Sequence, residues 1–353
     1  MTNRERVKKA LAHEETDRIP IDLGGIFTSA PESTQKRLVD ILGITGERDP
    51  YMTHFDDRIQ KYFDCDIRAI TPNNLPYWGF TDFYEAPLRN ASIEDLEHYP
   101  WPEGDDAMIK GLEEKARYIA GSGYFMYSGQ IADGIFEQGC YMRGYDQFLI
   151  DCAINKDFVH AFNRKVLDVS KKLVDHYFSV VGPYVDIVLH GDDLATQNAP
   201  YMSPESFREL FKPYFIEFVD AIKKHCPNGV IEHHCCGSSF RLLDDIKEIG
   251  FDVINPVQTT ANEMSAENLV TKKDKLSFHG GVDLQHVLPY GTKEEIETFV
   301  KNLIDKLGKN GGYILGPCHT LPDDVSAESV IIMMEAAKKW GVYRKKKEVR
   351  GVR

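Results

Sequence analysis

Residues 185–237 read VDIVLHGDDLATQNAPYMSPESFRELFKPYFIEFVDAIKKHCPNGVIEHHCCG, and this stretch decides the fold class. It opens with an apolar run that ends in two aspartates. A helix pattern then starts at Ser203 as N-cap, with Pro204 in the first helical position. The stretch closes on a second apolar run, VIEHHCC. Strand, helix and strand in this order predict a βαβ unit with two parallel strands.

The same alternation extends along the chain in both directions. Further helix patterns carry their own start signals, a capping box at Thr292 and Glu295 and an N-cap at Ser326. Eight runs followed by helices predict a (β/α)8 barrel with extra N-terminal helices. A doubly wound sheet is the structural rival, although no G-x-G-x-x-G follows any run. The eight runs are 18–24, 66–72, 123–129, 185–192, 230–236, 252–257, 276–281 and 311–317.

The domain organisation expected from this count is a single barrel domain over residues 1–345. The gaps at about 25–65 and 73–122 are longer than one crossover, so both are expected to hold helical insertions or a lid. Residues 346–353 form a basic tail.

Composition and charge narrow the class of protein. The 353 residues are 42% apolar and 27% charged with a net charge of −13, which argues against nucleic acid and anionic membranes as partners. No run approaches the roughly 18 apolar residues of a membrane helix, and the charged start lacks a secretory signal, so a cytoplasmic enzyme is expected. Seven cysteines in such a chain are expected to be core residues, metal ligands or reactive thiols.

Polar side chains gather at the C-terminal ends of the runs, which form the catalytic face of a barrel. We expect Asp192, Asp193 and His279 to be catalytic, by handling a substrate proton or orienting the substrate. Solvated loop positions, turn caps or local backbone contacts are the ordinary alternatives for such residues. The expected substrate contacts are Asp22, Asn255, Gln258, Asp283 and His319.

The fifth run carries the candidate metal ligands. Because side chains alternate along a strand, His233 and Cys235 face one way and His234 and Cys236 the other. We favour His234 and Cys236 as the pair that points into the barrel, because the outer face of a barrel strand packs on helices and is expected to be the more apolar. An imidazole and a thiolate on one face suit zinc, and Cys318 at the end of the eighth run is the expected third ligand. The alternative is a set of small buried cysteines without a metal.

Six pieces of the sequence resemble the uroporphyrinogen decarboxylase superfamily, over essentially the whole chain. The resemblance implies a (β/α)8 barrel and one of two branches, metal-free decarboxylases or zinc methyltransferases that work with corrinoid proteins. The pieces are RERVKKALAHEETDRIPIDLGG, GDDLATQNAPYMSPESFRELFKPY, HCCGSS, IGFDVINPVQ, FHGGVDLQHVLP and GGYILGPCHTLPDDVSAESV.

The branch is indicated by one departure from the decarboxylase pattern and one match to the methyltransferase pattern. Decarboxylases carry an arginine-rich segment after the first strand, where this chain has GGIFTSAPES without arginine. Methyltransferases carry H-x-C-G on the fifth strand and a cysteine after the eighth, which His234, Cys236 and Cys318 match. The pieces GDDLATQ and FHGGVD resemble bacterial members that demethylate methoxylated aromatics, although Pro317 and His319 flank Cys318 where coenzyme M methyltransferases carry glycines.

The resemblance therefore implies methyl transfer from a small methylated substrate, an aryl methyl ether, to the Co(I) corrinoid of a partner protein. The chain has no D-x-H-x-x-G cobalt-ligand motif of its own, so Zn²⁺ is the expected resident cofactor and a corrinoid protein the expected partner. The alternatives are methyl transfer from a corrinoid to a thiol, a porphyrinogen decarboxylase, and a zinc-binding barrel without activity.

Overall fold

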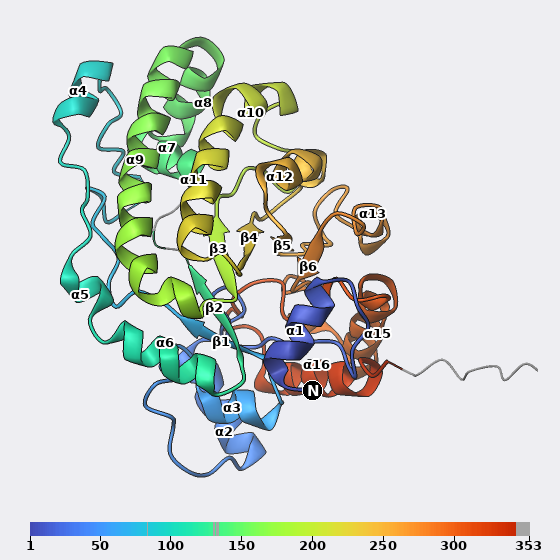
Figure 1. The fold of residues 1–353 in the computed structure, drawn as a ribbon. Coiled ribbons are helices and arrows are strands. Elements are labelled where there is room, and N and C mark those ends of the chain that lie inside the picture. Colours follow the sequence, from blue (N-terminus) through green and yellow to red (C-terminus); the bar gives the residue numbers. More distant parts are fainter. Residues whose placement is uncertain (83, 130, 132–133, 344–353) are drawn as a thin grey trace, which may run out of the picture.

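Seven parallel strands form one curled sheet in the order β1 to β7, with each strand paired to the next along the chain (Figure 1). The computed structural model describes residues 1–343 except 83, 130, 132 and 133. The predicted α/β-barrel fold class is confirmed. The strands are β1 Ile67–Ile70, β2 Phe125–Gly129, β3 Ile187–Gly191, β4 Val230–His234, β5 Val253–Asn255, β6 Ser277–His279 and β7 Tyr313–Ile314.

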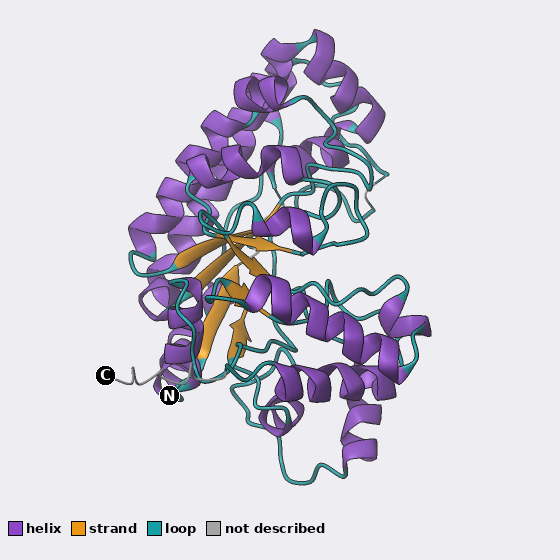
Figure 2. Cartoon of the chain, turned by 90° about the vertical axis from the view of Figure 1, so that its right-hand side faces the viewer, coloured by secondary structure: helices purple, strands orange, loops and turns teal. Residues whose placement is uncertain are grey.

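Helices surround the sheet and fill the connections (Figure 2). The first half of the chain carries α1 Asn3–Leu11, α2 Glu32–Leu42, α3 Asp57–Tyr62, α4 Ile93–His98, α5 Asp106–Ile109, α6 Leu112–Gly121, α7 Ile135–Arg143, α8 Tyr145–Ile154 and α9 Lys156–Val181. The second half carries α10 Pro204–Leu210, α11 Lys212–His225, α12 Leu243–Ile249, α13 Ala266–Val270, α14 Val287–Tyr290, α15 Lys293–Leu303 and α16 Ala327–Trp340. Two short 3₁₀-helices, η1 Gly182–Tyr184 and η2 Phe240–Leu242, and a short π-helix, η3 Ile304–Gly308, are also present.

The expected first strand, 18–24, is reduced to an isolated bridge that closes the barrel between β7 and β1. Ile21 bridges Leu315 in parallel, and its carbonyl oxygen accepts the Asp66 N–H at 2.9 Å. The Ile21 N–H, however, donates to the Asp66 carboxylate at 2.8 Å. Pro20 has no N–H to donate, so a regular ladder cannot form here. The seam of the barrel is therefore held by a few backbone hydrogen bonds on the two sides of Ile21 and by the Asp66 side chain.

All three of these helix starts expected from the sequence are present, with Ser203 capping α10, and one expected helix is broken. Thr292 and Glu295 form the capping box of α15, and Ser326 accepts a backbone hydrogen bond at the start of α16. The helix expected from Ser203 onward divides into α10 and α11 around Phe211. Pro213 explains the break, because proline removes one helical hydrogen bond and its ring crowds the preceding turn.

The long gaps after the first two runs contain short helices. The gap 25–65 holds α2 and α3, and the gap 73–122 holds α4, α5 and α6. The basic tail expected at 346–353 lies outside the described residues.

The apolar core has two parts, one on each side of the sheet. The smaller part fills the barrel interior and includes Ile67, Tyr127, Leu189 and Val253 from neighbouring strands. The larger part packs the outer face of the sheet against the helices. Apolar side chains of this smaller cluster therefore contribute to the barrel interior beneath the C-terminal ends of the strands.

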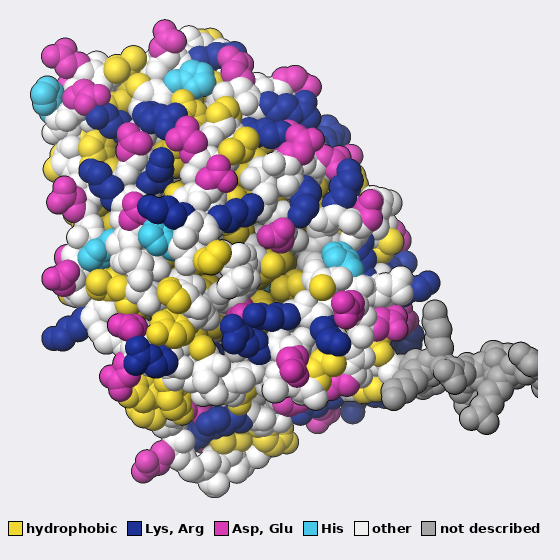
Figure 3. Space-filling view, viewed as in Figure 1, with side chains coloured by type: hydrophobic (Ala, Val, Ile, Leu, Met, Phe, Trp, Pro, Cys, Tyr) yellow, Lys and Arg dark blue, Asp and Glu magenta, His cyan; other side chains and the backbone are white. Residues whose placement is uncertain are grey.

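The exposed surface carries both signs of charge. Figure 3 shows acidic and basic side chains interspersed over the face seen in Figure 1. In the part of the chain that the structure describes, every helix is too short or too polar to span a bilayer.

Candidate metal centre and barrel mouth

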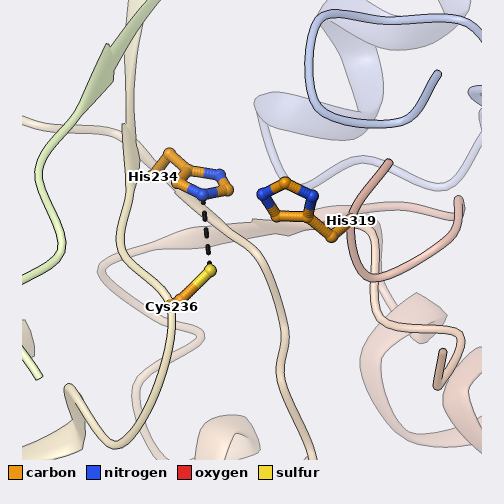
Figure 4. A group of neighbouring side chains, drawn as sticks. All are labelled: His234, Cys236 and His319. Carbon is orange, nitrogen blue, oxygen red and sulfur yellow. Dashed lines mark hydrogen bonds between the residues drawn. The ribbon is translucent and has the colours of Figure 1, made fainter. Parts of the chain in front are cut away.

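Three potential metal ligands meet at the C-terminal end of β4. The ligand atoms of His234, Cys236 and His319 all lie within 4.8 Å of one another (Figure 4). His234 ends β4, Cys236 follows two residues later, and His319 comes from the loop after β7. Strands far apart in sequence thus deliver two imidazoles and one thiol to a single point at the barrel mouth.

Asn255 fixes the orientation and tautomer of His234. The Asn255 side-chain nitrogen donates to the His279 carbonyl oxygen at 3.3 Å, so its Oδ1 faces His234 Nδ1 at 2.6 Å as an acceptor. The proton of His234 must then sit on Nδ1, which leaves the Nε2 lone pair free. This is the arrangement by which proteins orient a metal-binding histidine through its other ring nitrogen.

The donor set fits a zinc ion. His234 Nε2 lies 3.5 Å from Cys236 Sγ. Zinc at about 2.0–2.1 Å from a nitrogen and about 2.3 Å from a sulfur, at a tetrahedral angle, holds those atoms about 3.5 Å apart. Burial lowers the pKa of both His234 and His319 to about 4, so both rings are neutral at pH 7 and able to ligate.

The thiols of this region need a metal to ionise. Burial raises the pKa of Cys236 far above its usual range, and it raises that of Cys318 to about 12. A metal ion would displace the Cys236 proton, which makes affinity dependent on pH.

Cys318, the third ligand expected from the sequence, is outside the three-residue group. Its thiol is buried, and its backbone N–H donates to the Val282 carbonyl oxygen at 2.9 Å. It is still near Cys236, because a charge on Cys318 raises the pKa of the Cys236 thiol. His319, expected from the sequence to contact substrate, belongs to this group with His234 and Cys236.

Phe27 covers the histidine side of this group. Its ring stacks on His234 with centroids 3.8 Å apart and lies 5.1 Å from the His319 ring. Phe27 belongs to the GGIFTS segment that follows the first run and contains no arginine. An aromatic ring rather than a cationic group therefore lies beside His234.

The aspartate pair after β3 is engaged by backbone N–H groups. Asp192 accepts from Phe136 and Glu137 at 3.0 Å each, which caps the start of α7. Asp193 accepts from the Cys236 N–H at 2.7 Å and so fixes the turn that carries this thiol. Burial raises the pKa of both carboxyls. The geometry favours positioning over direct proton transfer for the pair.

Two further expected substrate contacts also bind backbone. Gln258 accepts from the Gly237 N–H at 2.7 Å, next to the Cys236 turn. Gly237 has φ +84°, and a Cβ there would lie 2.5 Å from the Thr196 carbonyl oxygen, so glycine is required. Asp283 accepts from three backbone N–H groups at the start of α14, those of Gln285, His286 and Val287.

A buried ionic network lies inside the barrel. His279 Nδ1 lies 2.8 Å from Glu232 and its Nε2 lies 3.1 Å from Asp22. Tyr127 donates to the other Glu232 oxygen, and Thr28 donates to Asp22 at 2.5 Å. Burial alone would lower the pKa of His279, but the two carboxylates raise it to about 10. His279 is therefore an imidazolium held between two anions.

This network makes stability depend on pH in the alkaline range. The folded pKa of His279, about 10, lies above its ordinary value of 6.5. Its contribution to the free energy of unfolding is therefore complete below about pH 6.5 and declines as the pH rises toward 10. Urea unfolding between pH 6 and 9.5 is expected to show this decline for the wild type and a flatter profile for His279→Gln. Equal slopes for the two proteins would contradict the assignment.

Several side chains around the candidate site are not predicted from the sequence. Glu232 shares the inward face of β4 with His234, so strand alternation gave a signal for it. The roles of Asn255 as a histidine partner and of Phe27 as a cover depend on contacts between distant segments. His233, on the opposite face of β4, packs against His190 and Phe251.

The fold and site define an α/β barrel with a candidate His/Cys metal centre at its mouth. The family model for uroporphyrinogen decarboxylase (URO-D) matches residues 131–340, more than half of the chain, and the protein belongs to this family. No match was found among curated protein sequences.

The chain was also compared with solved structures, and its fold is similar to that of a methyltransferase. A methyltransferase from Methanosarcina mazei aligns over 96% of this chain and 99% of its own, with a TM-score of 0.66 and 16% identity. Xylanase 10B from Thermotoga maritima aligns over 96% and 98% with a TM-score of 0.45 and 11% identity.

Proposed function

We propose that this protein is a zinc-dependent methyltransferase that moves a methyl group from an aryl methyl ether to the Co(I) corrinoid of a partner protein. The observation that carries the proposal is the group of His234, Cys236 and His319, with Asn255 fixing the free lone pair of His234. The fold shared with a methyltransferase and the family match support it.

The protein's own residues hold and shield the reacting centre. His234, Cys236 and either His319 or Cys318 would hold zinc, and the separations of the side chains favour His319. Zinc bound there would supply a Lewis acid for the ether oxygen of the methyl donor. Asn255 and Asp193 keep the two central ligands in place, and Phe27 excludes water from the histidine side.

A thiol is the alternative methyl acceptor, because a His/Cys zinc site also lowers the pKa of a bound thiol. A porphyrinogen decarboxylase would need cationic groups where Phe27 stacks on His234. A zinc-binding barrel without activity would keep the metal and transfer no methyl group.

Two measurements test the proposal. Elemental analysis of the purified protein is expected to give about one zinc per chain. The absorption spectrum of a Co(I) corrinoid is then expected to change to that of a methylated corrinoid when the protein and a methoxyarene are added. The zinc content of Cys318→Ala and His319→Ala identifies the third ligand. Absence of stoichiometric zinc would overturn the metal site, and unchanged cobalt spectra with methoxyarenes would overturn the activity.

A further inference from the structure

A pocket of about 400 Å³ lies at the opposite end of the barrel from the candidate metal centre. Three segments meet there, namely the turn after α1, the turn before β6 and the turn before β7. The first contributes His13 to the pocket lining, the second contributes Lys273 and the third contributes Lys309. Because β6 and β7 begin at this end, the pocket belongs to the N-terminal face of the barrel.

Gly312 brings a histidine and a lysine of this pocket together. Its N–H donates to the Ala10 carbonyl oxygen at 2.6 Å, which joins the turn before β7 to the end of α1. Gly312 has φ +70°, and a Cβ there would lie 2.6 Å from His13 Nδ1 and 3.0 Å from Lys273 Cε. The absence of a side chain at Gly312 therefore allows the imidazole and the end of the lysine chain to approach the same point.

The nitrogen of His13 on this side carries the free lone pair. The Ser277 hydroxyl donates to the Leu11 carbonyl oxygen at 3.5 Å, so its oxygen accepts from His13 Nε2 at 3.3 Å. The proton of the neutral ring is then on Nε2, and Nδ1 can accept another. Burial, together with the charges of Lys273 and Lys247, lowers the pKa of His13, so the ring is mainly neutral at pH 7.

Burial also makes the Lys273 amine a better nucleophile at neutral pH. In the part of the chain that the structure describes, its Nζ donates to the Lys309 carbonyl oxygen rather than to a carboxylate. Burial lowers the pKa of Lys273 to about 8, although the charge of Glu15 opposes this shift. About half of the amine is then uncharged at pH 8, compared with less than about 1% for an ordinary lysine. The uncharged amine is the form that attacks a carbonyl carbon.

Two further lysines give the pocket an affinity for anionic groups. Lys306 lines it and pairs with Glu267. Lys309 is exposed, and it forms no ion pair with any residue that the structure describes. Asp274 also lines the pocket, but it is exposed, so water weakens its repulsion of an anion. Lys309 is therefore the cation best placed to bind a phosphate group beside the amine.

We propose that Lys273 is a site of acylation by acyl phosphates, with His13 as the proton acceptor and Lys309 as the group that binds the phosphate. The Nζ lone pair forms a bond to the acyl carbon, the bond from that carbon to the phosphate oxygen breaks, and inorganic phosphate leaves with the electron pair. The amine proton passes to Nδ1 of His13, directly or through one water, and then to solvent.

The product suits this environment. The amide is uncharged, as burial favours, and its single N–H can keep the hydrogen bond to the Lys309 carbonyl oxygen. Because the pocket and the candidate metal centre lie at opposite ends of the barrel, the inference does not depend on the proposed function.

Treatment of the purified full-length protein with acetyl phosphate at pH 8, followed by peptide mass spectrometry, tests the proposal. Lys273 is expected to be acetylated about tenfold faster than Lys36, which is exposed on α2, because its larger uncharged fraction outweighs its lower intrinsic nucleophilicity. This comparison within the wild type needs no variant. A rate at Lys273 no higher than that at Lys36 would overturn the proposal.

Two variants separate phosphate binding from proton transfer, with N-hydroxysuccinimidyl acetate as an acetylating reagent that carries no phosphate. Lys309→Met is expected to slow acetylation of Lys273 by acetyl phosphate about threefold, the effect of one exposed ion pair, and to leave the rate with the second reagent unchanged. His13→Gln is expected to slow both reactions, because the amine loses its proton in each.

Lys172→Met is the matched control, since Lys172 is exposed on α9, and it should leave both rates at Lys273 unchanged. Circular dichroism checks that each variant is folded. Wild-type rates with acetyl phosphate in folded Lys309→Met, or with both reagents in folded His13→Gln, would overturn the roles assigned to these two residues and with them the proposed site.

Discussion

His234→Ala is expected to lower zinc affinity by more than about 100-fold and to abolish methyl transfer. A lost ligand exceeds the roughly 10–100-fold effect of removing a residue that only orients a ligand. Asn255→Ala is expected to lower zinc affinity by this smaller factor, because the substitution releases the ring of His234 without removing a metal ligand. Competition with a chromophoric chelator measures both affinities.

The neighbouring His233 provides the control for this prediction. It lies on the same strand but on the outer face, packed against Phe251 with ring centroids 4.8 Å apart. His233→Leu is expected to retain stoichiometric zinc and the wild-type circular dichroism spectrum. Zinc affinity that is unchanged in His234→Ala, or lost to the same degree in His233→Leu, would show that β4 does not hold the metal through its inward face.

His279→Leu is expected to reduce the free energy of unfolding by about 3–5 kcal/mol, the usual effect of removing one partner from a buried ion pair. The substitution leaves the carboxylates of Glu232 and Asp22 facing each other without a cation, in a region with no solvent exposure. One oxygen of Asp22 already lacks a hydrogen-bond partner, so its environment offers little compensation. Chemical denaturation at pH 6 to 7, where the imidazolium is fully formed, gives the largest difference.

Two comparisons separate this effect from the loss of any buried histidine. His233→Leu removes an uncharged ring, whose Nδ1 lies 3.3 Å from His190 Nδ1, and is expected to lower stability by no more than about 2 kcal/mol. The double variant Glu232→Leu with His279→Leu is expected to recover part of the loss, since one stranded carboxylate is gone. A single His279→Leu variant as stable as the wild type would show that the network does not stabilise the fold.

The fold could be predicted from the sequence because local periodicity determines most of it. Seven of the eight apolar runs contain the strands of the sheet, and alternation along β4 separates inward His234 from outward His233. The strand expected over the first run, 18–24, is not formed, and this difference also has a local cause. Pro20 has no backbone N–H that could donate a hydrogen bond to a neighbouring strand.

The site was less accessible to sequence reasoning, because its details depend on segments that meet only in three dimensions. Asp192 caps a helix that starts more than fifty residues earlier in the chain, so nothing near Asp192 signals this role. Whether Cys318 or His319 lies closer to His234 and Cys236 depends on the path of the loop after β7. The alternation of side chains along a strand does not predict the path of a loop. Asn255 was recognised as a site residue, but its partner His234 comes from a neighbouring strand.

The seam of the barrel makes ring closure depend on the N-terminal helix. The Ile21 N–H donates to the Asp66 carboxylate instead of to a backbone carbonyl of a neighbouring strand. This carboxylate also forms ion pairs with Arg6 at 2.6 Å and with Arg18 at 2.7 Å. Ile21 and Leu315 come from opposite ends of the chain, so their contact carries the greatest loop-closure entropy in the sheet. Loss of the Arg6 side chain in α1 is therefore expected to weaken ring closure at the seam where the Asp66 carboxylate supplements the backbone hydrogen bonds of Ile21.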